Sequence, residues 1–173
     1  TKPRLILRQI IMLIIGIDPG TARLGYGIID IDSGSKSGMT FVTAGCLTTK
    51  VETPVGERLW FLQSEIGKIL VKYKPDALAI EQLFFGINSR TAMAVGQARG
   101  VVLAVAAKNK IPIFEYQGLS VKFTLTGFGR SDKKQMQESV RKHLKMKQII
   151  KPDDAADGLA IAIMHYLKTK KNV

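Results

Sequence analysis

The segment "LIIGID", residues 13–18, is an apolar run that ends in a carboxylate, Asp18, and a Pro-Gly pair follows at once. A continuous apolar run of this length, bounded by a turn signal, is typical of a buried strand. Aspartate is among the poorest strand formers, so its place at the end of this run requires a compensating interaction. The segment "ALAIE", residues 77–81, repeats the pattern with Glu81. Because ligand sites of α/β sheets lie at the carboxyl ends of strands, we expect a site at these two acids.

The charge of the chain is strongly positive. Lysine and arginine outnumber the acids by 26 to 14, which gives a net charge of +12. Such an excess favours an anionic partner, with nucleic acid as the first candidate and solubility alone as the alternative. The segment from Arg130 to Lys151 carries much of this charge.

The 173 residues, 46% of them hydrophobic, suit one globular domain, to which we assign residues 12–173. Residues 1–11 look like an N-terminal extension outside the domain, and we assign them no role. The single cysteine, Cys46, cannot form an internal disulfide, so we expect a reducing compartment, the cytoplasm. No apolar run reaches the length of a membrane span, and we expect no membrane partner.

Hydrophobic periodicity predicts an α/β domain with a mixed five-stranded sheet and helices on both of its faces. Three strands joined by short turns form an antiparallel meander, and strands alternate with helices after it. Ser131 is expected to cap a basic helix. The predicted strands cover residues 12–18, 25–31, 40–49, 77–81 and 111–116, and the predicted helices cover residues 55–73, 89–109, 132–146 and 153–168.

A third group of acids begins the last predicted helix, in "PDDAADGLAIAI". Asp154 and Asp157 are three residues apart and therefore share one helix face. If that face packs at the strand ends, it joins Asp18 and Glu81 in one cluster of acids. Such a cluster repels itself unless cations are bound, and carboxylate oxygens suit Mg²⁺ or Mn²⁺. Two such ions about 3.5–4 Å apart hydrolyse phosphodiesters in many enzymes.

Several motifs together resemble the RuvC family of bacterial Holliday-junction resolvases. They follow one order over residues 12–168 and read "GIDPGTARLGYGII", "AIEQLFF", "GQARGV", "GFGRSDKKQMQ" and "DDAADGLAIAI". The resemblance implies an RNase H-like fold of the retroviral integrase superfamily and a homodimeric endonuclease that cuts four-way DNA junctions by paired symmetric nicks, in recombination and repair. It implies a catalytic and metal-binding set of Asp18, Glu81, Asp154 and Asp157, and the RuvA–RuvB branch-migration complex as a partner.

The resemblance also marks positions that touch DNA. Lys122 and Lys133 match lysines near the scissile phosphate, and Phe84 matches an aromatic residue that stacks on an unpaired base. Further expected DNA contacts are Asn88, Arg90, Arg130 and Lys134.

Three other functions compete with this interpretation. The "GIDPGT" segment also resembles the phosphate hairpin of actin-type ATPases, but the chain is too short for two lobes and has no Asp-Gly-Gly loop. A ribonuclease of RNA–DNA hybrids would share the fold and the metals. A catalytically inert binding module would not need all four acids.

Overall fold

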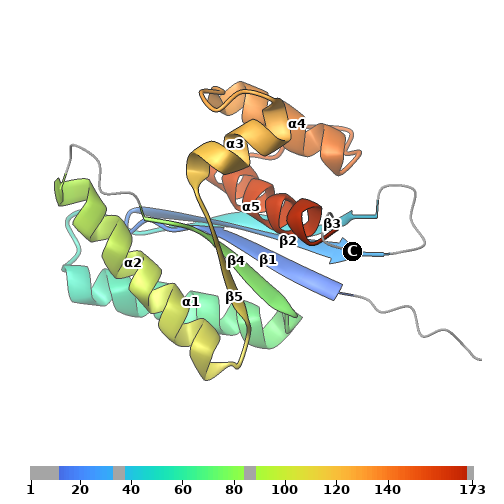
Figure 1. Cartoon of the computed structure of the whole chain (residues 1–173). Coiled ribbons are helices and arrows are strands. Elements are labelled where there is room, and N and C mark those ends of the chain that lie inside the picture. Colours follow the sequence, from blue (N-terminus) through green and yellow to red (C-terminus); the bar gives the residue numbers. More distant parts are fainter. Residues whose placement is uncertain (1–11, 33–37, 84–88, 171–173) are drawn as a thin grey trace, which may run out of the picture.

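The computed structural model describes residues 12–32, 38–83 and 89–170, without the side chains of residues 89–91. This part of the chain holds five strands and five helices (Figure 1). In chain order they are β1 (Met12–Asp18), β2 (Arg23–Ile31), β3 (Thr40–Thr48), α1 (Val55–Tyr73), β4 (Ala77–Glu81), α2 (Ser89–Lys108), β5 (Ile113–Tyr116), α3 (Gly118–Thr126), α4 (Lys133–His143) and α5 (Asp153–Lys170).

The strands form one mixed sheet in the order β3-β2-β1-β4-β5. β1, β2 and β3 pair antiparallel, as the predicted meander requires, and β4 and β5 join them in parallel with β1. β1 therefore lies at the centre of the sheet, where it pairs with β2 on one side and β4 on the other. This position explains its unbroken apolar sequence, because both faces of a central strand are covered.

The two faces of the sheet carry different helices. α1 and α2 pack on one face around Ile15 and Ile17, whereas α5 packs on the other around Ile14, with α3 and α4 outside it (Figure 1). Side chains alternate between the faces of a strand, so Asp18 points to the same face as Ile14, the face of α5. The same alternation assigns Glu81 to that face, because Ala77 and Ala79 belong to the core beneath α5.

α5 approaches the sheet so closely that its backbone touches the strands. A Cβ added at Gly16 of β1 would lie 2.1 Å from the carbonyl oxygen of Gly158 in α5, and one at Gly25 of β2 would lie 1.9 Å from that of Asp154. Only glycine fits at such positions. These contacts bring the acidic first turns of α5 down onto the carboxyl end of β1.

The predicted fold class is confirmed, but one helix was missed. α3 has no counterpart among the predicted elements, because its apolar residues Leu119, Val121, Phe123 and Leu125 recur every second position and give no helical stripe. The helix buries only Val121 and Leu125 and leaves the other two exposed.

The predicted cap of α4 was also wrong. Asp132, one residue after Ser131, accepts a hydrogen bond from the backbone N–H of Gln135, and the Gln135 side chain returns to the backbone N–H of Asp132. This reciprocal pair is a capping box. Ser131 is instead buried, and its hydroxyl donates to the carbonyl of Phe128. No helix in the described part of the chain is long and apolar enough to cross a membrane.

The close approach of α5 generates a prediction. Gly16→Ala should lower the melting temperature by about 5 °C or more, because the new methyl meets fixed backbone and overpacking costs about 1–3 kcal/mol or more. Gly67→Ala in α1 is the matched control, since its Cβ would meet only Val105 at 4.0 Å. That change should raise the melting temperature slightly, through the better helix propensity of alanine. Equal melting of both variants would contradict the packing described for α5.

Candidate active site

Two carboxylates stand side by side at the carboxyl end of the sheet. β1 and β4 run parallel and pair in register up to Ile17 and Ile80, and the next residue of each strand is an acid, Asp18 or Glu81. The two carboxyl groups are within hydrogen-bonding reach of each other. Parallel, in-register strands thus place on one edge the two acids that the sequence separates by more than sixty residues.

The third acid comes from α5. Asp157, in the second turn of this helix, lines the same hollow as Asp18 and Glu81. Its placement follows from the close packing of α5 on the sheet, since Gly158 beside it lies against the backbone of Tyr26 in β2. The structure therefore brings Asp18, Glu81 and Asp157 together.

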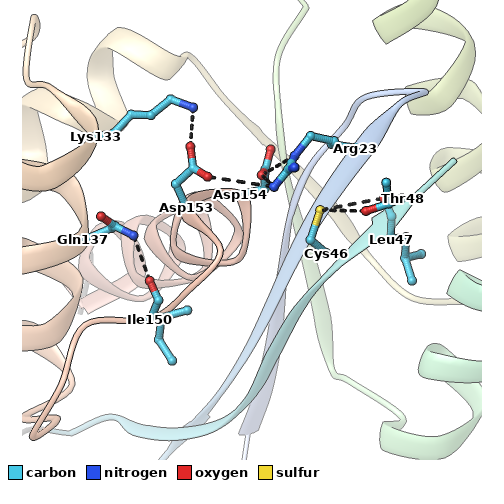
Figure 2. Close-up of polar contacts among 9 residues, drawn as sticks. All are labelled: Arg23, Cys46, Leu47, Thr48, Lys133, Gln137, Ile150, Asp153 and Asp154. Atoms are coloured by element: carbon cyan, nitrogen blue, oxygen red, sulfur yellow. Dashed lines mark hydrogen bonds and ion pairs between the residues drawn. The ribbon is translucent and has the colours of Figure 1, made fainter. Parts of the chain in front are cut away.

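Asp154 takes a different orientation, because its carboxylate is held by Arg23 at the start of β2. The distances from Asp154 Oδ2 are 2.7 Å to Nε and 2.5 Å to Nη2 of Arg23. Both guanidinium nitrogens thus contact the same carboxylate oxygen, and hydrogen bonds between charged groups of this kind are stronger than those between neutral groups. Asp153, the neighbouring residue, accepts from Lys133 of α4 and lies 4.0 Å from Arg23 (Figure 2).

The crowding of carboxylates changes their titration. Burial raises the pKa of Asp18 to about 8, and the charges of Glu81 and Asp157 add to the effect. Burial also raises the pKa of Asp157 to about 6, with the charge of Asp153 as the next cause. The pKa of Glu81 is raised by burial, against the opposing effects of a hydrogen bond from Asp18 and the charge of Lys122. At neutral pH without a cation, Asp18 is therefore mostly protonated.

The hollow at these acids has a volume of about 370 Å³ and carries both signs of charge. Lys122 of α3 and Lys133 of α4 line it together with Asp18, Glu81 and Asp157. Gly118, the first residue of α3, forms part of the wall, and a Cβ there would lie 2.1 Å from Glu81 Oε1. The site thus combines anionic oxygen ligands with cations that suit an anionic substrate.

The donor set fits a hard divalent cation, because it consists of carboxylate oxygens. Burial raises the pKa of Asp18 and Asp157, and the charges of neighbouring carboxylates raise both further. As the side chains stand, no three of the described His, Cys, Asp or Glu residues enclose an ion site. One physical reason is visible at Asp154, whose carboxylate is engaged by Arg23. Metal binding by all four acids therefore requires at least this side chain to exchange partners.

The other residues predicted to touch DNA are placed differently. Lys134 and Arg130 line two further surface hollows, one beside Phe128 and one beside Phe123. Phe84 and Asn88 lie outside the described residues, and so does the side chain of Arg90.

Arg23 and Asp153 were missed as site residues by the sequence reasoning. Arg23 follows Asp18 by five positions and lies outside the predicted strand of residues 25–31, although the structure places it at the start of β2. Asp153 reads as a first-turn acid that satisfies a helix terminus. Only the contact of α5 with β2 brings the two residues together, and no spacing in the sequence signals it.

Comparison with known proteins identifies the family. The model of the family described as "Crossover junction endodeoxyribonuclease RuvC" matches residues 14–165. The chain belongs to the RuvC family. Family members are divalent-metal nucleases, and this protein is accordingly a crossover junction endodeoxyribonuclease.

Relatives in the RuvC family are close in sequence and fold. RuvC of Roseiflexus sp. (strain RS-1) is 50% identical over 87% of this chain and 88% of its own length. RuvC of Fusobacterium nucleatum is 49% identical over 89% of this chain and 80% of its own. The Thermus thermophilus RuvC structure is 30% identical and superposes with a TM-score of 0.83 over 93% of this chain and 97% of that one. The same protein in complex with Holliday junction substrate gives a TM-score of 0.84 over 93% of this chain and 96% of that one.

The raised pKa of Asp18 generates a prediction about stability and pH. A carboxyl group whose pKa is about 8 in the folded state and near 4 when unfolded loses stabilisation as the pH rises through 8. In EDTA, the melting temperature of the wild type should fall between pH 6 and pH 9 by more than that of Asp18→Asn. At pH 9 the variant should melt higher than the wild type, by roughly a few degrees.

Mg²⁺ provides the second arm of this experiment. It should raise the melting temperature of the wild type, because a ligand of the native state stabilises by mass action. Asp18→Asn should gain less from Mg²⁺. If both proteins show the same pH dependence in EDTA and the same response to Mg²⁺, Asp18 does not belong to a crowded carboxylate site.

Proposed function

We propose that the hollow at Asp18, Glu81 and Asp157 is the nuclease centre of a Holliday-junction resolvase, which hydrolyses one phosphodiester bond in a strand of a four-way DNA junction. The observation that carries the proposal is the meeting of three carboxylates with Lys122 and Lys133 in one hollow. The acids provide ligands for metal cations, and the lysines provide positive charge for the phosphates of a DNA backbone.

The residues divide into two groups by role. Asp18, Glu81, Asp154 and Asp157 hold Mg²⁺, with Mn²⁺ as a substitute and two ions per site. The ions, when bound, supply activation of a water molecule and stabilisation of the leaving oxygen. Asp18 stands next to Glu81 at the end of the central strand, and its ionisation accompanies metal binding because metal ligands must be deprotonated.

The lysines position the substrate. Lys122 and Lys133 bind the phosphate at the centre, while Arg130 and Lys134 contact phosphates farther along the strand without reading sequence. Phe84 stacks on an unpaired base near the crossover, and Asn88 and Arg90 contact the same part of the junction. The similar Thermus thermophilus RuvC is in complex with Holliday junction substrate, which supports DNA of this form as the ligand.

The reaction follows the family. The oxygen of water forms a bond to phosphorus and the bond from phosphorus to the 3′ oxygen breaks, which leaves a 5′-phosphate and a 3′-hydroxyl. Two chains related by a two-fold axis suit a two-fold symmetric junction, so a homodimer makes the paired, symmetric nicks. The RuvA–RuvB branch-migration complex is the partner in recombination and repair, and the cytoplasm is the compartment.

A cleavage assay tests this function. With Mg²⁺, the protein should cut a synthetic four-way junction, and leave a linear duplex and an RNA–DNA hybrid of the same sequence intact. On a supercoiled plasmid with an extruded cruciform, paired nicks should give linear product rather than nicked circles. Asp18→Asn should bind the junction and cut nothing. Preferential cleavage of the hybrid would overturn the proposal in favour of a ribonuclease.

The roles of the lysines generate a quantitative prediction. For Lys122→Ala and Lys133→Ala, the slope of log affinity against log salt concentration should be shallower than that of the wild type by about one. The measurement is junction binding in EDTA over a range of salt, so that cleavage does not interfere. Lys72→Ala, on α1 at the opposite face of the sheet, is the matched control and should leave the slope unchanged. Unchanged slopes for both test variants would remove these lysines from the DNA surface.

A further inference from the structure

The carboxylate of Asp153, beside the site, contacts one cation directly and lies near a second cation from a different element. Asp153 Oδ2 accepts from Nζ of Lys133, and its other oxygen, Oδ1, lies 4.0 Å from Nη2 of Arg23 (Figure 2). Arg23 begins β2, Lys133 begins α4 and Asp153 begins α5. Three elements therefore converge on this carboxylate.

The placement of Arg23 and Lys133 around the Asp153 carboxylate resembles the placement of cations around a phosphate group in a protein. Two oxygens of one anion face two cations, as two non-bridging oxygens of a phosphodiester would. Both cations are accessible, because the side chains of Arg23 and Lys133 are 50% and 77% exposed. An arginine fork and a lysine are the side chains that bind phosphates most often.

The position also fits a DNA strand that enters the nuclease centre. Lys133 lines the catalytic hollow with Asp18 and Asp157, and it also lines a second, open hollow with Lys134 and Lys151. Asp153 is the one acid among the residues around that second hollow. A phosphate between Arg23 and Lys133 would thus neighbour the phosphate at the centre, and the Lys133 ammonium, with three donors, can contact both.

We propose that Arg23 and Lys133 form a phosphate-binding site for the DNA strand, and that Asp153 occupies this site as an internal competitor until the substrate displaces it. The proposal rests on the nuclease function proposed above and adds Arg23 and Asp153 to the residues that bind substrate. Displacement of Asp153 frees Lys133 toward a backbone phosphate, and Arg23 reaches the same phosphate by exchanging its shorter contacts with Asp154. DNA binding and the freeing of a metal-ligating carboxylate are therefore linked.

Junction binding in EDTA tests the proposal without any contribution from metal or cleavage. Asp153→Asn keeps the shape of the side chain and removes the competing charge, so it should bind the junction about two- to fivefold more tightly, the range expected for an exposed ion pair. Arg23→Gln should bind more weakly, with a salt slope shallower by about 0.9. Glu57→Gln, an exposed first-turn acid of α1 on the opposite face of the sheet, is the control for the change in net charge.

A double-mutant cycle separates competition from a general charge effect. In an Arg23→Gln, Lys133→Gln background, the Asp153→Asn change should no longer tighten binding beyond the effect of Glu57→Gln. Melting temperatures of all variants check that each is folded at the binding temperature. The proposal is overturned if Asp153→Asn binds as the wild type does, if Glu57→Gln tightens binding equally, or if the effect persists in the double background.

The same data distinguish failure of this inference from failure of the nuclease proposal. A wild type that binds four-way junctions no better than linear duplex would overturn the proposed function itself. A wild type that prefers junctions, together with an inert Asp153→Asn and an unchanged salt slope for Arg23→Gln, would overturn the phosphate site alone.

Discussion

The contact of α5 with the sheet is the constraint on which the site depends. Glycines in β1, β2 and α5 let the helix backbone touch the strands, and this contact alone carries the acids of the last helix to the end of the first strand. In an ordinary helix–sheet packing, side chains would hold α5 several ångströms farther away. Asp157 would then lie away from Asp18 and Glu81, and the cluster of carboxylates would not form. The core and the active site are therefore products of the same packing.

The electrostatics of the site are balanced by the protein's own cations. Asp154 is paired with Arg23 and Asp153 with Lys133, while Asp18, which is hydrogen-bonded to Glu81 and has no cation paired with it among the described residues, retains its proton. In the proposed function, a divalent ion replaces Arg23 at Asp154, and a DNA phosphate replaces Asp153 at Lys133. Without metal and DNA, these acids and cations are therefore paired with one another.

The sequence predicts the residues that line the hollow better than the ion pairs beside it, for a physical reason. Asp18 and Glu81 each end an apolar run, and β-strand alternation with parallel pairing places them together without further information. The position of Asp157 follows from helical spacing and the glycines around it. Arg23 and Asp153 come together only through a long-range contact between β2 and α5. No periodic pattern in the sequence signals this contact. α3 was missed because its apolar residues, including the exposed Leu119 and Phe123, recur at every second position. This spacing is typical of a strand and not of a helix.

The most direct test of the account counts the protons that leave when metal binds. Calorimetric titration of the DNA-free protein with Mg²⁺ at pH 7, in two buffers of different ionisation enthalpy, gives this number. Because Asp18, with a pKa of about 8, must ionise to bind a cation while Asp157, at about 6, is already mostly ionised, the account predicts release of about one proton per chain. Asp18→Asn should release almost none. Binding heats that do not depend on the buffer in the wild type would contradict a crowded carboxylate site that cations relieve.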